Sequence, residues 1–113
     1  ADGLRSRSAS KFEVIDELEI TEKSATDYLE NVYESVKMLI QSFMAEEGYK
    51  PYSHEAIIAY AADELNLDLV DINTFNRYRK LRNDLIYRGQ VASVEEAKDI
   101  RRFYLELKSK LDI

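Results

Sequence analysis

The sequence contains no cysteine, a single histidine, a single proline and three glycines in 113 residues. Without cysteine the chain forms neither a disulfide nor a thiolate zinc site, and one histidine excludes most histidine-rich metal sites. Because proline and glycine are scarce, few residues are suited to turns, which favours long helices over a sandwich of short strands. The sequence therefore predicts an all-α protein without a metal or another cofactor.

Long hydrophobic runs are also missing, and none approaches the roughly 18 residues that a membrane-spanning helix needs. Residues 1–20 lack the apolar segment of a secretory signal. The length of 113 residues suits a single domain. We therefore expect one cytoplasmic domain that does not enter a membrane.

The charge of the chain is −6 overall, but it is unevenly distributed. Residues 12–49 contain ten acidic and two basic residues, whereas residues 77–110 contain ten basic and five acidic residues. The net charge argues against a protein that coats nucleic acid indiscriminately. The basic half is suited to RNA, and the alternative is that both halves are ordinary solvated helix faces.

Apolar residues recur at helical spacing in four segments, each bounded by capping or stop residues. The first expected helix starts near Thr21 or Ser24 and ends at Gly48, and the others cover residues 53–66, 73–87 and 93–111. The clearest start signal is a capping box of Ser93 and Glu96, and Gly48 and Gly89 end two of the helices. The segment 67–73 is expected to be a short connection. Four main helices with short connections predict an antiparallel up-and-down bundle.

The first twenty residues are expected to lie outside this bundle. Residues 1–10 are small, polar and aperiodic, which predicts a flexible arm. Residues 11–20 fit neither a helix nor a strand well, so they are expected to form a short helix or an extended lead-in. The predicted organisation is thus an N-terminal arm or lead-in at residues 1–20 and a helical bundle at residues 21–113.

The third expected helix ends in an unusual motif, Leu-Arg-Asn-Asp-Leu-Ile-Tyr-Arg-Gly, at residues 81–89. Its Arg82 continues the apolar stripe that Phe75, Tyr78 and Leu85 form. One interpretation is that Arg82 pairs with an acid of the first or second helix. The other is that Arg82 lines a cleft and binds a phosphate through its planar guanidinium.

This motif, together with Gly-Tyr-Lys-Pro-Tyr-Ser-His at residues 48–54, resembles the HEPN family of small helical bundles. The resemblance covers roughly residues 21–111 and implies a homodimer, often with a small nucleotidyltransferase as partner. Catalytic members are metal-independent ribonucleases whose motif is Arg, a polar residue and, a few residues later, His. Arg82 and Asn83 match the first two positions, but Tyr87 stands in place of His.

The presence of Tyr87 where the motif has His bears on whether the chain is a ribonuclease or a non-catalytic binding module. Attack by a 2′-hydroxyl needs a proton acceptor whose pKa lies near the working pH, and the ordinary pKa of tyrosine is about 10. The resemblance therefore implies a non-catalytic module that binds RNA or a nucleotide, or that pairs with a nucleotidyltransferase-type protein. Some family members carry an AMP-accepting tyrosine two residues further on, where this sequence has Gly89.

Two alternatives stay open. A divergent metal-independent endoribonuclease of the toxin–antitoxin type would use Arg82 and Asn83 with Tyr87 or His54 as the base. This requires His54 to reach the phosphate site near Arg82, whereas a neutral, packed histidine is the simpler interpretation at a helix N-terminus. The other alternative is a purely structural bundle without a ligand.

Basic and aromatic residues around the motif are the candidates for contacts with a nucleic acid. Interleaved arginines and tyrosines suit phosphate binding and stacking on single-stranded RNA. Residues at these positions spread over more than one helix face, so a solvated or intersubunit surface is the alternative. The candidates are Tyr78, Arg79, Arg82, Asn83, Tyr87 and Arg88.

Overall fold

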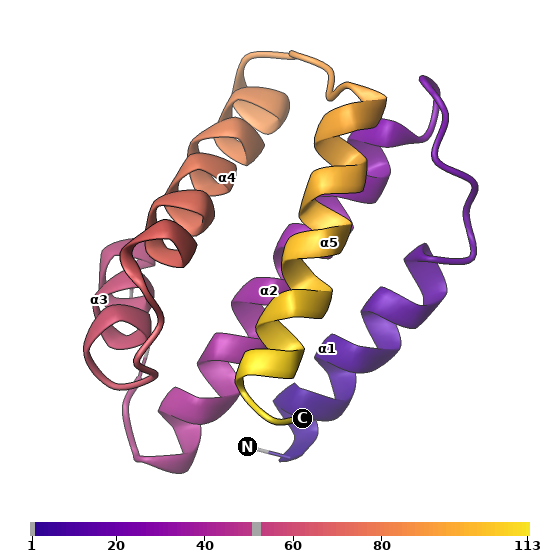
Figure 1. Cartoon of the computed structure of the whole chain (residues 1–113). Coiled ribbons are helices and arrows are strands. Elements are labelled where there is room, and N and C mark those ends of the chain that lie inside the picture. Colours follow the sequence, from indigo (N-terminus) through magenta and orange to yellow (C-terminus); the bar gives the residue numbers. More distant parts are fainter. Residues whose placement is uncertain (1, 51–52) are drawn as a thin grey trace.

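The computed structural model describes residues 2–50 and 53–113, the side chain of residue 2 excepted. These residues form helices and no strand, so the all-α prediction is confirmed. No helix in the described part of the chain combines the length and apolar character needed to cross a membrane. The helices are α1 (Asp2–Ile15), α2 (Ala25–Glu46), α3 (His54–Asp63), α4 (Leu69–Tyr87) and α5 (Val94–Lys110), shown in Figure 1.

Helix α2 is the central element, because it packs against each of the other four helices. Its apolar stripe is buried as the spacing predicted, and two tyrosines of α2, Tyr28 and Tyr33, are fully buried with it. A 22-residue helix that is surrounded in this way buries enough apolar surface to organise a small core. The buried apolar residues of α2 are Ala25, Tyr28, Leu29, Val32, Tyr33, Val36, Leu39, Ile40 and Met44.

The helices do not alternate strictly in direction. Figure 1 shows that α1 and α4 run one way, while α2 and α5 run the other. Helix α3 runs in the same direction as α2, because His54 at its start contacts Tyr33 in the middle of α2. Tyr60, near the end of α3, packs edge-on against Tyr49, which follows the end of α2. The alternation expected of an up-and-down bundle is therefore not observed at α3.

The N-terminal segment differs from the expected flexible arm. Residues 2–15 form α1, which packs along α2. Phe12 stacks on Tyr104 of α5 with ring centroids 4.3 Å apart, and Asp16, just after α1, forms an ion pair with Arg101 at 2.8 Å. The buried positions of α1, Ser8, Phe12 and Ile15, have helical spacing, but one of them is polar, so the apolar repeat that reveals the other helices is weak in α1.

Helix α4 begins four residues earlier than expected, at Leu69. The side chain of Asp68 caps it by accepting a hydrogen bond from the backbone N–H of Asp71 at 2.9 Å. Most of the expected connection at residues 67–73 is therefore helical. The stripe of α4 that faces the other helices extends back to Asp71 and alternates steps of four and three residues. Its members are Asp71, Phe75, Tyr78, Arg82 and Leu85.

Most of the other boundary signals are confirmed, except that α2 begins at Ala25, after Ser24, whose side chain makes no capping hydrogen bond. Ser53 caps α3, although α3 ends at Asp63, before the expected stop at Asn66. Ser93 and Glu96 form both hydrogen bonds of the capping box at the start of α5. Gly89, just after α4, has a φ of +66°, a left-handed conformation that glycine adopts without strain. The motif at residues 48–54 includes Pro51 and Tyr52, which lie outside the described residues.

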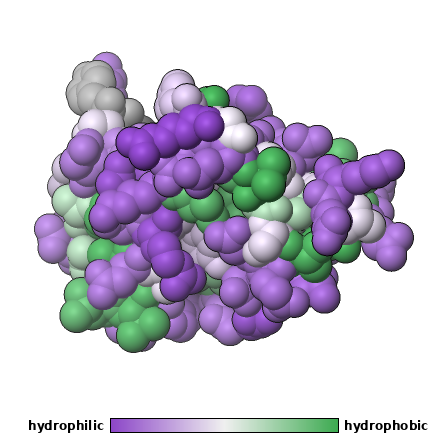
Figure 2. Space-filling view, turned by 90° about the horizontal axis from the view of Figure 1, so that it is seen from above, coloured by the Kyte–Doolittle hydropathy of each residue, from purple (hydrophilic) through white to green (hydrophobic). Residues whose placement is uncertain are grey.

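The face that Figure 2 shows is mostly hydrophilic, and hydrophilic residues separate its apolar groups. The large apolar side chains that are exposed include Val14, Leu69, Val70, Tyr87 and Val91. Scattered apolar residues are normal on a protein surface. This face therefore supplies no argument for a docking surface.

Candidate site between helices α2, α3 and α4

Arg82 and His54 both contact one buried tyrosine, Tyr33 of α2. The Tyr33 hydroxyl oxygen is 3.0 Å from His54 Nδ1, at the start of α3. The Arg82 guanidinium of α4 lies over the Tyr33 ring, 6.0 Å from its centroid. Phe75 stacks on the same ring, with centroids 5.8 Å apart. Three helices thus bring two of the candidate residues together.

Charged side chains surround this tyrosine. The Glu34 carboxylate accepts a hydrogen bond from Arg82 Nη2 at 3.1 Å, and its other oxygen is 3.0 Å from Lys37 Nζ. Arg79 of α4 is close enough to act on His54 electrostatically. Lys37 and Arg82 therefore share the Glu34 carboxylate, and Arg79 adds a third positive charge nearby, which leaves an excess of positive charge. We call Tyr33, Glu34, Lys37, His54, Arg79 and Arg82 the Tyr33 cluster.

His54 is neutral at pH 7 in this environment. Burial lowers its pKa most, the positive charges of Lys37, Arg82 and Arg79 lower the pKa further, and Glu34 acts in the opposite direction. In the tautomer whose Nδ1 carries no proton, the Tyr33 hydroxyl donates its hydrogen bond to that nitrogen. Burial raises the pKa of Tyr33 far above its ordinary value, so the hydroxyl keeps its proton.

Arg82 retains unused hydrogen-bonding capacity. Its side chain is 20% exposed, and Nη2 is bound to Glu34. Its Nε is buried and makes no hydrogen bond to any described residue. The ion pair that the sequence allowed between Arg82 and an acid of the first predicted helix is therefore present. The guanidinium still offers donors to a further acceptor.

The remaining motif residues do not gather at this site. Tyr87 is 77% exposed, and Arg88 is similarly exposed and lies 3.6 Å from Asp84. A helix turns by about 100° per residue, so Asn83 and Tyr87 project in different directions from Arg82. The motif therefore contributes one residue to the Tyr33 cluster instead of forming a continuous patch.

Tyr78 is placed differently from its expected role in base stacking. Its ring is only 3% exposed and packs against Phe103 of α5, with centroids 6.1 Å apart. A buried ring is not available to stack on a base. Arg79, by contrast, is partly exposed and donates from Nε to Asn76 Oδ1 at 2.9 Å, so it stays a candidate for phosphate binding.

Sequence reasoning missed Tyr33, Glu34 and Lys37 as site residues. Tyr33 follows the apolar spacing of the first predicted helix, and Glu34 and Lys37 lie within the mostly acidic residues 12–49, so neither pattern marks them as site residues. The available signal was the Glu-x-x-Lys spacing beside a buried tyrosine, which places both charges on neighbouring turns of α2. That spacing is common on helices, and only the packing of α4 against α2 makes it part of a site.

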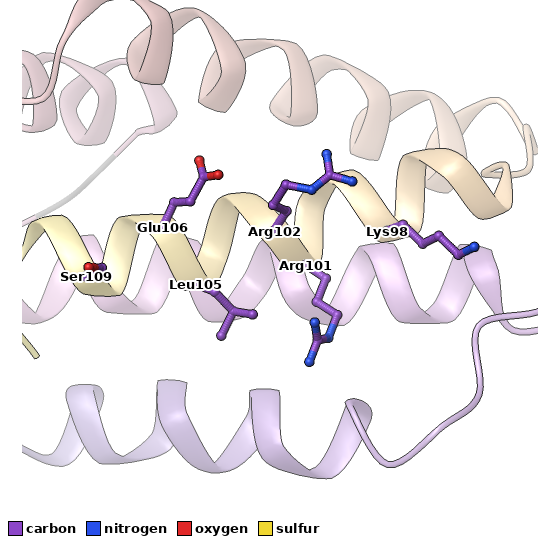
Figure 3. A pocket seen from close by; sticks show the side chains of 6 residues that line it. All are labelled: Lys98, Arg101, Arg102, Leu105, Glu106 and Ser109. Atoms are coloured by element: carbon purple, nitrogen blue, oxygen red, sulfur yellow. The ribbon is translucent and has the colours of Figure 1, made fainter.

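Two surface hollows elsewhere fit a phosphate less well. One, of about 480 Å³, is lined from α5 by Lys98, Arg101, Arg102, Leu105, Glu106 and Ser109 (Figure 3). Figure 3 shows Arg101 pointing toward the α1 side, where Asp16 binds it, and Arg102 pairs with Asp99 at 2.8 Å. A second hollow contains three acids, and it is lined by Arg77, Tyr78, Lys80, Leu81, Asp84, Glu96 and Asp99.

Comparison with known proteins assigns no family. No family model matches the chain, and no curated protein and no solved structure matches it either. The relationship to the HEPN family therefore stays a prediction from residues 48–54 and 81–89. In the part of the chain that the structure describes, no group of three or more His, Cys, Asp or Glu residues is arranged to hold a metal ion.

Proposed function

We propose that this chain is a non-catalytic module of the HEPN type that binds phosphate groups of RNA or of a nucleotide at the Tyr33 cluster. The supporting observation is that Lys37 and Arg82 share one carboxylate with Arg79 nearby, while Arg82 Nε has no partner among the described residues. A guanidinium binds phosphate through its planar fork, and charge-assisted hydrogen bonds are the strong ones.

The net charge of −6 limits the kind of ligand that suits this site. A long polyanion meets repulsion over the acidic parts of the surface, whereas a short single strand or a nucleotide needs only the local excess of positive charge. The proposal therefore favours a small phosphate-bearing ligand. Homodimerisation and a nucleotidyltransferase-type partner are the parts of the proposal that rest on the resemblance alone, and light scattering of the purified chain tests the dimer.

A binding experiment with matched arginine variants tests the proposed site. We expect Arg82→Ala to weaken binding of a fluorescein-labelled single-stranded RNA at least tenfold, measured by anisotropy. Arg88→Ala is the control, because Arg88 is an exposed arginine of the same helix outside the cluster. Equal affinities for the wild type and Arg82→Ala would leave the pair of Arg82 with Glu34 as a structural feature only.

A divergent ribonuclease is the second candidate, and the position of His54 favours it. His54 is neutral, is 3.0 Å from Tyr33 and acts in the same cluster as Arg82. A neutral imidazole accepts a proton from a 2′-hydroxyl near pH 7, which replaces the missing histidine of the motif. Such an enzyme needs no metal.

Incubation with single-stranded RNA in EDTA distinguishes the enzyme from the binding module. Cleavage that resists EDTA and disappears in both Arg82→Ala and His54→Ala supports the enzyme. Cleavage that survives Arg82→Ala indicates a contaminating nuclease. A folded protein that binds RNA through Arg82 and leaves it intact is the binding module.

A further inference from the structure

The Glu34 carboxylate occupies the place that a ligand phosphate needs in the Tyr33 cluster. One of its oxygens is 3.1 Å from Arg82 Nη2, and the other is 3.0 Å from Lys37 Nζ. A carboxylate and a phosphate use the same donors on these side chains. A phosphate that takes over these contacts with Arg82 Nη2 and Lys37 Nζ therefore displaces Glu34.

The Glu34 side chain can also be displaced by a ligand. Its side chain is 26% exposed, so it borders solvent instead of being enclosed in the core. An ion pair with this exposure contributes little to stability, about 1 kcal/mol or less. A ligand that offers more charge than one carboxylate therefore meets only a small barrier to replacing it.

We propose that Glu34 is a built-in competitor that fills the phosphate site of the free protein and selects for phosphate monoesters. This inference rests on the function proposed above. A diester carries one negative charge, the same as the displaced carboxylate, whereas a monoester carries about −1.5 to −2 at pH 7. A nucleoside monophosphate or a 5′-phosphorylated RNA end therefore gains charge complementarity on replacing Glu34, and an internal diester does not.

The unused donor of Arg82 supports the same preference. Glu34 engages Nη2 and leaves Nε without a partner among the described residues. A terminal phosphate has three free oxygens, so after replacing Glu34 it can bind Nη2 and Lys37 and still offer an oxygen to Nε, which is buried in the free protein. The carboxylate has only two oxygens, and Lys37 Nζ contacts both of them, at 3.0 and 3.2 Å, while Arg82 Nη2 contacts one.

Affinities of Glu34→Gln for three probes test this inference. The probes are AMP, a 5′-phosphorylated single-stranded RNA decamer and the same decamer with a 5′-hydroxyl. We expect Glu34→Gln to bind AMP and the phosphorylated decamer about fivefold more tightly than the wild type, the factor that corresponds to the loss of one partly exposed ion pair. Glu106→Gln, an exposed residue of α5, loses the same charge and is expected to show no change.

The outcomes separate this inference from the proposed function. If binding of AMP does not depend on Arg82, the proposed function fails, and the inference fails with it. If binding depends on Arg82 but Glu34→Gln binds no more tightly, Glu34 is not a competitor while the binding site stands. An equal gain in Glu106→Gln indicates a general charge effect and overturns the inference, as does a wild type that binds the 5′-hydroxyl decamer as tightly as the phosphorylated one.

A second variant keeps the test valid if Glu34→Gln does not fold. Glu34→Asp retains the charge but shortens the side chain by one methylene, so its carboxylate cannot span Arg82 and Lys37 together. We expect it to bind AMP more tightly than the wild type. Unfolding in urea is the matching readout, because a purely structural Glu34 would lower stability on substitution and leave the affinity for AMP unchanged.

Discussion

Arg82 and Asp71 are the two charged members of the buried stripe of α4, and each is paired with a residue of another helix. Arg82 binds Glu34 of α2, and Asp71 binds Lys110 of α5 at 2.6 Å. Burial of a charged side chain without a partner is strongly destabilising. These ion pairs therefore offset the cost of placing Arg82 and Asp71 in the buried stripe of α4. Asp71 is almost fully buried, whereas Arg82 reaches solvent, and only Arg82 is therefore suited to a ligand.

The hydrogen bond between Tyr33 and His54 can be tested by Tyr33→Phe. This change leaves the partly buried Nδ1 of His54 without its partner, and a lost hydrogen bond of this kind costs about 1 kcal/mol. We expect a lower midpoint in urea unfolding, with an unchanged slope. Tyr87→Phe is the control, because the exposed Tyr87 hydroxyl should contribute nothing. Equal stability of the two variants would argue against the hydrogen bond.

The lowered pKa of His54 makes stability depend on pH. Burial and the neighbouring cations hold the folded-state pKa below the ordinary value of 6.5, so the unfolded chain binds a proton that the folded chain excludes. We therefore expect the free energy of unfolding to fall as the pH drops from 7 through the folded-state pKa. Urea titrations at pH 7 and pH 5.5 measure this change.

His54→Asn is the matched control for this pH dependence. Asparagine offers an acceptor to Tyr33 but does not titrate, and the chain contains no other histidine. The stability difference between pH 7 and pH 5.5 should largely disappear in this variant. Because the imidazole is unique, its NMR titration also reports the pKa directly, and a midpoint at or above 6.5 would contradict the environment described for His54.

At the scale of the helix, α1 and α5 are held by different physical means. Helix α5 has a capping box and an apolar stripe, so local sequence predicts it. Helix α1 lacks a continuous apolar stripe, and tertiary contacts account for its order, among them the stack of Phe12 on Tyr104 and the ion pair of Asp16 with Arg101. Most helical stability in proteins comes from such packing and not from propensity.

Phe12→Ala tests whether α1 belongs to the cooperative core. Removal of this buried ring is expected to lower the free energy of unfolding by about 3 kcal/mol, because it leaves a cavity against Tyr104. Val14→Ala is the control on the same helix, since Val14 is 68% exposed. Denaturant unfolding measures both changes. If the two variants were equally stable, the segment would be the flexible arm that its composition suggests.

At the scale of the whole molecule, the excess of acidic residues confines anion binding to few positions. On α5, Arg101 is paired with Asp16, Arg102 with Asp99 and Lys110 with Asp71. In the Tyr33 cluster, Lys37 and Arg82 share Glu34, and Arg79 adds a third positive charge nearby. The number of counterions released on binding RNA is therefore expected to be small.

The salt dependence of RNA binding measures that number. If Lys37, Arg79 and Arg82 are the only phosphate contacts, the logarithm of the affinity for single-stranded RNA should fall with the logarithm of salt concentration with a slope of about −2. Anisotropy titrations between 50 and 200 mM salt, concentrations at which such slopes are commonly compared, provide the measurement. A slope steeper than about −5 would place the contacts on a wider surface than this cluster.

Local signals in the sequence determined the helical class and most helix boundaries. Three of these signals are the apolar stripe of α2, the cap at Ser53 and the capping box at Ser93. Each depends only on residues close together in the sequence, so it can be recognised without knowledge of the fold. The sequence alone also singles out Arg82 as a candidate site residue, because a charged residue stands where the period of the stripe requires an apolar one.

Only the tertiary structure decided which residues share a site. Tyr33, His54 and Arg82 stand on three helices, and their proximity depends on α3 running with α2 while α4 runs against it. The order of α1 and the pairing of Glu34 with Arg82 have the same origin. Such contacts join residues far apart in the chain, and their free energy depends on packing that no local pattern of residues encodes.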